Sequence, residues 1–238
     1  ILKVMYNTKV EDFIVEDNEI RGIVTANGNK IYGDKVIIST GGKSVPTTGS
    51  DGSMYDILSK YGHKIDPLYP ALVPLVIKEG FVKNLQGVSM KNVVLGAKVK
   101  KKKYEIIGDM IFTHFGISGP LILTGSRFIE PNKNYTIHID LKPALNISEL
   151  DKRVQKDFKT YINKDFKNSL DDLLPQKIIP MIIRRSKINE NKKVNEITKE
   201  ERKNLVTVIK DFSFELDGVR PLAEGIVTQG GVRSEERR

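Results

Sequence analysis

The run Phe112-Thr113-His114-Phe115-Gly116-Ile117-Ser118-Gly119-Pro120 places a histidine, a threonine and a serine among glycines. Pro120 favours the first position of a helix, because proline lacks the backbone N–H that would stay unpaired there. The run lies within a region of short β-like segments, so we expect a sharp turn followed by a helix. Two interpretations stay open: a tightly turned structural loop, or a loop that presents reactive side chains.

The residues around this run, 71–147, predict a β-rich domain. Several segments are short and either apolar or alternating, as strands are. They are Leu75–Ile77, Val93–Val99, Tyr104–Ile107 and Tyr135–Leu141. Lys100 to Lys103 separates two of them and predicts an exposed hairpin tip, where four like charges discourage pairing between sheet edges.

Residues 1–38 predict a β-meander with a hairpin turn at Asn27-Gly28, because both residue types tolerate a positive φ. The continuous apolar run Val36-Ile37-Ile38 is typical of a strand buried on both faces of a sheet. It ends in Ser39-Thr40-Gly41-Gly42, at the end of a strand where α/β sheets bind ligands. Glycines there leave backbone N–H groups open to a phosphate or a ring, although Gly-Gly after a strand is also an ordinary turn.

A second polar loop, Thr47 to Gly52, leads into a predicted helix that ends at Gly62. The apolar residues of this helix recur at helical spacing and are Met54, Ile57, Leu58 and Tyr61. Three prolines between Pro67 and Pro74 then predict a rigid connector, and therefore a domain boundary near residue 70.

Residues 148–211 predict three helices. Ser148 is a candidate N-cap for the first helix, whose apolar stripe consists of Leu150, Val154, Phe158 and Ile162. Pro175 begins the second helix, and Thr198 with Glu201 predicts a capping box for the third. Strand-like sequence returns at Phe212 to Leu216 and at Gly225 to Val232.

Composition excludes several classes of protein. The 238 residues include no cysteine, which rules out disulfide scaffolds, cysteine–zinc sites and thiol nucleophiles. The apolar runs are too short to span a bilayer, so no membrane partner is expected. No G-x-G-x-x-G, Walker or clustered metal-ligand motif occurs, and we expect no metal. The first residues are Ile-Leu-Lys, without an initiating Met or a signal peptide, which suggests a piece of a longer protein.

The net charge of +9 is concentrated in one stretch, because residues 151–210 carry 16 basic and 9 acidic side chains. A basic surface of this kind attracts nucleic acid or acidic partners. The alternative is a set of well-solvated helices, since neither an RNA-binding motif nor interleaved aromatic residues accompany the charge.

Motifs spread over the whole chain resemble one bacterial flavoprotein family. Besides Phe112 to Pro120, they are Val36 to Pro46, Tyr69 to Leu75, Leu85 to Ser89, Asp140 to Pro143, Val194 to Thr198, Arg220-Pro221 and Val227 to Val232. On these residues the chain is similar to the NAD(P)/FAD-dependent oxidoreductases of the BaiN/RdsA or YhiN type. The resemblance implies an α+β / α/β fold: a FAD-binding domain of the glutathione-reductase kind, interrupted by an insert with a barrel-like part and a small helical part.

The resemblance also implies a division of the chain and a set of sites. Residues 1–70 belong to the FAD-binding domain, 71–147 to the β-rich insert, 148–211 to its helical subdomain, and 212–238 to the return strands. Val10 passes the adenine of FAD, and Thr40, Gly41 and Gly42 lie against the dinucleotide. A loop with Thr113, His114, Ser118 and Gly119 faces a small-molecule substrate. His114 is the candidate catalytic residue, and its role as acid–base group, hydrogen-bond anchor or structural plug stays open.

Departures from the family pattern predict a middle fragment. The glycine-rich turn that holds the FAD pyrophosphate and the segments beside the flavin do not occur, Met54 stands where a glycine is expected, and Val45 replaces an aromatic residue. We therefore expect a cytoplasmic oxidoreductase that transfers hydride between NAD(P)H, FAD and an organic substrate only as a longer protein. The chain alone is expected to bind FAD poorly and to be inactive.

Three roles for the insert stay open. It forms the substrate side of the oxidoreductase, it binds a nucleic acid or an acidic protein through its basic helices, or it serves as a lid or an oligomer contact.

Overall fold

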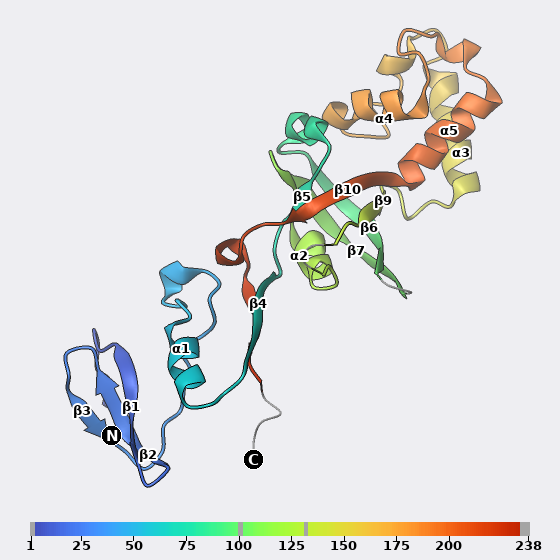
Figure 1. The fold of residues 1–238 in the computed structure, drawn as a ribbon. Helices are drawn as coiled ribbons and strands as arrows, with labels where there is room; N and C mark the ends of the chain where they lie inside the picture. Colours follow the sequence, from blue (N-terminus) through green and yellow to red (C-terminus); the bar gives the residue numbers. More distant parts are fainter. Residues whose placement is uncertain (1–2, 100–101, 131–132, 234–238) are drawn as a thin grey trace. The chain divides into compact units, whose positions relative to one another are not determined.

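The computed structural model describes residues 3–99, 102–130 and 133–233, and Figure 1 shows their fold. The chain divides into two compact units, one of residues 1–69 with 228–238 and one of residues 70–227. The strands β4 (Ile65–Ala71) and β11 (Val227–Val232) pair with each other, and the division between the units falls within them or at their ends. The finer division of the chain at residues 70, 147 and 211 stays a prediction.

The first unit contains the expected β-meander. Its strands β1 (Val10–Glu16), β2 (Glu19–Thr25) and β3 (Lys30–Tyr32) form an antiparallel sheet in that order. Asp17 and Asn18 both have positive φ, as a two-residue hairpin turn requires. The 3-10 turn Pro46–Thr48 and helix α1 (Ser53–Lys60) follow. A small core joins sheet and helix and consists of Phe13, Met54, Ile57 and Leu58.

The prediction of a strand at Val36-Ile37-Ile38 is wrong. The segment forms no strand, and Ile37 is 90% exposed. The backbone of residues 36–42 forms no hydrogen bond with any residue that the structure describes. A strand exists only through pairing with a neighbour, so an apolar run without one stays an extended segment.

The second unit confirms the mixed α/β class and the barrel-like insert. Six strands form a closed barrel in the order β10-β5-β8-β7-β6-β9. They are β5 (Leu75–Ile77), β6 (Ser89–Val99), β7 (Lys102–Phe112), β8 (Gly116–Ser118), β9 (Thr136–Asp140) and β10 (Phe212–Val219). β10 closes the barrel by pairing with both β9 and β5. The expected lysine hairpin tip falls partly outside the described residues, since β6 and β7 pair as far as Val99 and Lys102 but Lys100 and Lys101 are not described.

Period-two alternation places the side chains of β10. Phe212, Phe214 and Leu216 are buried, while Ser213 and Glu215 point outward. On the neighbouring strand Ile137 and Ile139 are likewise inside, and His138 lies outside as expected. Each such buried side chain stabilises the fold by about 1.5–3 kcal/mol.

Helix α2 (Pro120–Ser126) begins at Pro120, as the sequence predicts. It packs on the barrel through Leu121 and Ile122, which are buried. Ser126 fixes the end of the helix, because its hydroxyl accepts a hydrogen bond from the Val73 N–H and donates one to the Leu123 carbonyl.

Three helices form the basic region: α3 (Ile147–Thr160), α4 (Ile179–Ser186) and α5 (Lys199–Lys210). Short 3-10 turns accompany them and the barrel, at Gly80–Leu85, Phe166–Asn168, Gln176–Ile178, Val194–Glu196 and Leu222–Glu224. The capping box of Thr198 and Glu201 is confirmed. The N-cap of α3 is Asn146 rather than Ser148, because Asn146 and Glu149 form a capping box of their own.

The helices share their core with the barrel, since one continuous cluster of buried side chains includes residues of both. Ile162 lies beyond the end of α3 and is 47% exposed, so it does not extend the apolar stripe. Arg202 and Asp151 form an ion pair between α5 and α3, with Nε and Oδ1 2.7 Å apart. No helix among the described residues is long and apolar enough to span a membrane.

Candidate functional site

The loop between β7 and β8 is a tight turn. The N–H of Thr113 donates to the carbonyl of Gly116 at 2.8 Å, and the N–H of Gly116 donates to the Thr113 hydroxyl at 3.1 Å. Gly116 also lies against β5, because a Cβ on it would approach the Leu75 carbonyl oxygen to 2.1 Å. The turn is therefore fixed at its base, and Thr113 has a structural role in closing it.

His114 occupies the exposed position of this turn. Its ring meets the ring of Phe115 edge-on, with centroids 4.9 Å apart. The imidazole forms no hydrogen bond or ion pair with any residue that the structure describes. Its nitrogen atoms are therefore free to bind a ligand.

Ser118 and Gly119 lie at the other end of β8, away from the tip of the turn. Ser118 pairs with Ile111 in the sheet. Gly119 is the N-cap of α2 at φ +98°, and a Cβ there would lie 3.0 Å from the Cα of Met110. Both residues thus position the strand and the helix; the assignment of all four residues to a substrate-side loop stays a prediction.

Two charged residues that sequence reasoning missed lie beside this turn. The guanidinium of Arg220 sits 4.5 Å above the ring centre of Phe115. Its Nε and Nη2 donate to the two carboxylate oxygens of Glu224, at 2.9 and 2.6 Å. The spacing of four residues suggests an ion pair, but nothing in the sequence places that pair next to Phe115, which lies 105 residues before Arg220.

The ion pair shifts the pKa values of both Arg220 and Glu224 in the directions that favour their charged forms. Hydrogen bonding to Arg220 lowers the pKa of Glu224, and the nearby His114 lowers it further. The same carboxylate raises the pKa of Arg220. We name the four residues Phe115, His114, Arg220 and Glu224 the turn cluster.

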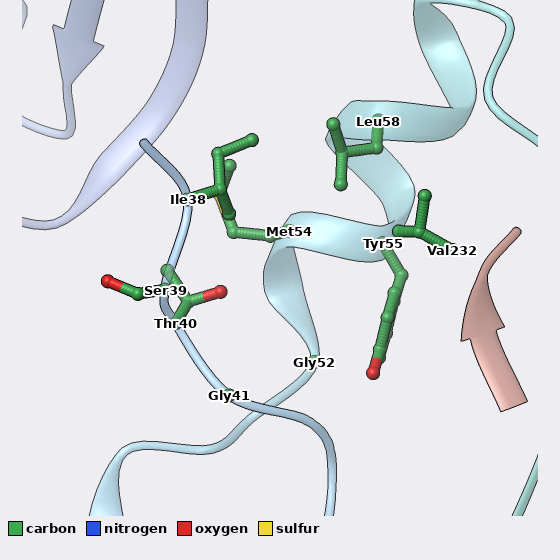
Figure 2. A pocket seen from close by; sticks show the side chains of 9 residues that line it. All are labelled: Ile38, Ser39, Thr40, Gly41, Gly52, Met54, Tyr55, Leu58 and Val232. Atoms are coloured by element: carbon green, nitrogen blue, oxygen red, sulfur yellow. The ribbon is translucent and has the colours of Figure 1, made fainter. Parts of the chain in front are cut away.

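The first unit contains a recess of about 230 Å³ beside α1. Figure 2 shows the segment from Ile38 to Gly41 along one side and Met54 and Leu58 of α1 along the other. Thr40 and Gly41 line the recess, as do Gly52 and Val232, whereas Val10 and Gly42 do not. The structure therefore brings together two of the four residues predicted to contact the cofactor.

Gly42 instead lies against Thr228. A Cβ at Gly42 would approach the Thr228 hydroxyl oxygen to 2.4 Å, so only glycine allows this contact. The hydroxyl accepts hydrogen bonds from the N–H groups of Lys43 and Ser44. The amides after the glycine turn are thus already paired, while those of residues 38–41 form no hydrogen bond with any described residue.

The recess offers backbone donors to a ligand. Its free N–H groups on residues 38–41 are suitable donors to phosphate or ring acceptors. Gly52, the N-cap of α1, places no side chain over the start of that helix. Within the described parts of the chain, no three histidine or acidic side chains lie close enough together to hold a metal ion.

The basic helices carry cations without partners. Seven of their side chains form no ion pair or hydrogen bond with the residues that the structure describes: Lys152, Lys156, Lys159, Arg184, Lys187, Lys199 and Lys203. The first three are exposed and follow one another at positions i, i+4 and i+7 of α3, opposite the buried Leu150 and Val154. We name these three the α3 lysine stripe.

Comparison with known proteins identifies the family. Residues 69–227 match the family described as "HI0933-like protein barrel and H2TH domain". The chain belongs to this family. The matched residues cover the barrel and the helices, and the turn cluster lies within them.

Three curated relatives extend the similarity of this HI0933-like chain to its first unit. It is 28% identical over 90% of its length to a 3-dehydro-bile acid delta(4,6)-reductase of Clostridium scindens. It is 30% identical over 92% to a ribosomal RNA dihydrouridine synthase of Haemophilus influenzae, and 24% identical over 98% to the protein of that name from Escherichia coli. The chain spans 53–56% of the length of these relatives.

Proposed function

We propose that the chain is part of a flavin-dependent reductase that adds two hydrogens across a carbon–carbon double bond conjugated to a carbonyl. The names of the relatives support a common chemistry. Dihydrouridine differs from uridine by two hydrogens on a ring bond conjugated to a carbonyl, and a delta(4,6)-reductase of a 3-dehydro bile acid acts on ring double bonds beside a ketone. The substrates otherwise have little in common, so the bond that is reduced is the feature that one family would share.

This proposal rests on His114, whose imidazole has no hydrogen-bond partner among the described residues and whose turn is held by two hydrogen bonds. Reduction of a conjugated double bond needs a hydride at the β-carbon, a proton at the α-carbon and a donor to the carbonyl oxygen. A bound flavin, with NAD(P)H as the electron source, supplies the hydride. His114 is the side chain we assign to donate to the substrate, because its nitrogen atoms have no partner among the described residues and two hydrogen bonds hold its turn.

The recess beside α1 is the part of the chain that we assign to FAD. Thr40 and Gly41 line it, and the free N–H groups of residues 38–41 are available to the dinucleotide. Val10 and Gly42 lie outside this recess, so the assignment rests on Thr40 and Gly41.

Within this reaction class we propose RNA as the substrate. The α3 lysine stripe presents three cations that no described acidic residue neutralises, which is suited to successive phosphates. A bile acid carries at most one anionic group, so it cannot pair with all three cations of the stripe. The name of two relatives agrees with this choice.

The experiment that tests this proposal uses the protein expressed from its full reading frame. Two candidate substrates, an RNA and a steroid, are offered to it in parallel. Reduced FAD is added anaerobically with a ribosomal RNA transcript or a 3-oxo-4,6-diene steroid, and the products are analysed by mass spectrometry. We expect uridine residues heavier by two hydrogens. The variant His114→Ala should lower the rate by about 100-fold or more, while His63→Ala, an exposed histidine outside the turn cluster, should leave it unchanged.

Two other outcomes would contradict parts of the proposal. If only the steroid gains hydrogens, the RNA assignment is wrong and the reaction class stands. If neither substrate gains two hydrogens, the reaction class itself is wrong.

A further inference from the structure

The guanidinium of Arg220 is held in one orientation. One face lies on the ring of Phe115, 4.5 Å from the ring centre. Two of its nitrogen atoms donate to both oxygens of Glu224, which fixes the plane of the group. The backbone is fixed as well, because the N–H of Arg220 donates to the carbonyl of Pro74 at 3.0 Å.

This arrangement leaves one edge of the guanidinium open. Nε and Nη2 are used by Glu224, and Nη1 donates to no residue that the structure describes. The Arg220 side chain is 32% exposed, so part of it is reachable from solvent. Arginine carries five N–H donors in a rigid plane, and the two on Nη1 remain for a ligand.

His114 precedes Phe115 in the turn, and the two rings are in contact. The ring of His114 and the guanidinium of Arg220 both contact the ring of Phe115, at 4.9 and 4.5 Å from the centre of that ring. The fixed cation and the free imidazole therefore contact the same aromatic ring, although His114 and Arg220 are 106 residues apart in the sequence. Two donor groups beside one ring are suited to a ligand with an acceptor oxygen on a planar ring.

We propose that the Nη1 edge of Arg220 binds a carbonyl oxygen of the substrate ring beside His114, and that Glu224 is the positioning residue for this arginine. The inference rests on the proposed function, because it takes the ring carbonyl from that reaction class. Glu224 touches no substrate in this scheme. It acts by holding Arg220 flat on Phe115.

The test measures binding without the reaction. The chain contains three histidines, His63, His114 and His138, so isotope labelling of histidine gives three imidazole signals. Uridine is the probe, since it has the ring carbonyls and no phosphate. We expect uridine to shift the His114 signal in a saturable manner, while His63 and His138 serve as internal references.

Variants then separate a binding role from a structural one. Arg220→Lys keeps the charge but loses the rigid fork, and it should weaken uridine binding by about tenfold. Glu224→Gln should also weaken binding, to a value between the wild-type chain and Arg220→Lys. The matched control is Arg127→Lys, because Arg127 lies 4.9 Å from the ring centre of Phe128 and its guanidinium forms no hydrogen bond with a described carboxylate. It should bind uridine as the wild type does.

Three results would overturn the inference. They are the absence of a His114 shift with uridine, unchanged binding in Arg220→Lys, and an equal shift with inorganic phosphate, which would indicate a general anion site. If both Arg220 and Glu224 variants change only thermal stability, the pair is structural. The binding test contains no flavin and therefore does not depend on the reaction. If uridine binds here but the activity assay with reduced FAD yields no reduced product, the proposed reaction is wrong and the binding site of Arg220 stands.

Discussion

The hydroxyl of Thr228 accepts hydrogen bonds from the backbone N–H groups of both Lys43 and Ser44, at 2.8 and 3.0 Å. The Ser44 hydroxyl lies 2.9 Å from the same oxygen, although 184 residues separate Ser44 from Thr228. Gly42 makes this approach possible, since a side chain there would collide with Thr228. One residue of β11 therefore holds the turn that follows the recess.

Replacement of Thr228 by valine should loosen this turn. Valine keeps the shape but removes the acceptor, and two N–H groups lose their partner, which costs about 1–3 kcal/mol when such groups are buried. We expect the amides of Lys43 and Ser44 to exchange with deuterium at least about tenfold faster. The matched control is Thr207→Val, because the Thr207 hydroxyl is exposed on α5 and only donates to the Lys203 carbonyl. Equal exchange rates in Thr228→Val and the wild type would contradict the role of Thr228.

Replacement of Gly116 by alanine should open the barrel at the base of the His114 turn. The new Cβ would lie 2.1 Å from the Leu75 carbonyl oxygen and 2.9 Å from the Ile77 nitrogen, and neither backbone can yield without breaking the β5–β8 pairing. We expect a loss of about 3 kcal/mol in the free energy of unfolding, measured by urea denaturation. Gly80→Ala is the control, since a Cβ on Gly80 would meet nothing within 4 Å, and a loss as large there would contradict the argument.

Acid should weaken the contact between α3 and α5. The hydrogen bond from Arg202 lowers the pKa of Asp151 below its ordinary value of 3.8. The stabilisation is therefore complete above that value and is lost as the pH falls through the lower pKa of the folded chain. We expect Asp151→Asn to be less stable at neutral pH and to show a smaller loss of stability in acid, as measured by circular dichroism during urea unfolding.

The control for this prediction is Asp171→Asn, because Asp171 is exposed and its carboxylate forms no ion pair with a described residue. It should follow the acid profile of the wild type. An unchanged profile in Asp151→Asn would show that the ion pair with Arg202 does not contribute.

Removal of the α3 lysine stripe should weaken RNA binding in a salt-dependent manner. Each phosphate contact releases counterions, so a variant with glutamine at Lys152, Lys156 and Lys159 should show a slope of log affinity against log salt smaller by about 2–3. Fluorescence anisotropy with a short single-stranded RNA gives this slope. A second triple variant controls for the loss of charge alone, with glutamine at Lys9, Lys30 and Lys35, which are exposed in the first unit. Equal slopes in the two variants would exclude the stripe as an RNA surface.

Local patterns predicted most of the elements. The capping box of Thr198 and Glu201, the start of α2 at Pro120 and the outward side chain of His138 all follow from interactions within a few residues. The tight turn around His114 was also indicated, because Gly116 and Gly119 follow the histidine closely and Pro120 favours the start of a helix. The prediction of Ser148 as an N-cap was wrong, because Asn146 forms the cap together with Glu149 three residues later.

The meander, the helices and the exposed turn could therefore be predicted from local sequence, because hydrophobic period, capping and turn chemistry act over a few residues. Which distant segments meet became visible only in the folded chain. Val36-Ile37-Ile38 has the pattern of a buried strand, yet it forms none, since pairing requires a neighbour that no local pattern supplies. The contacts of Arg220 with Phe115 and of Thr228 with Lys43 depend likewise on chain closure over long separations, which leaves no local mark in the sequence.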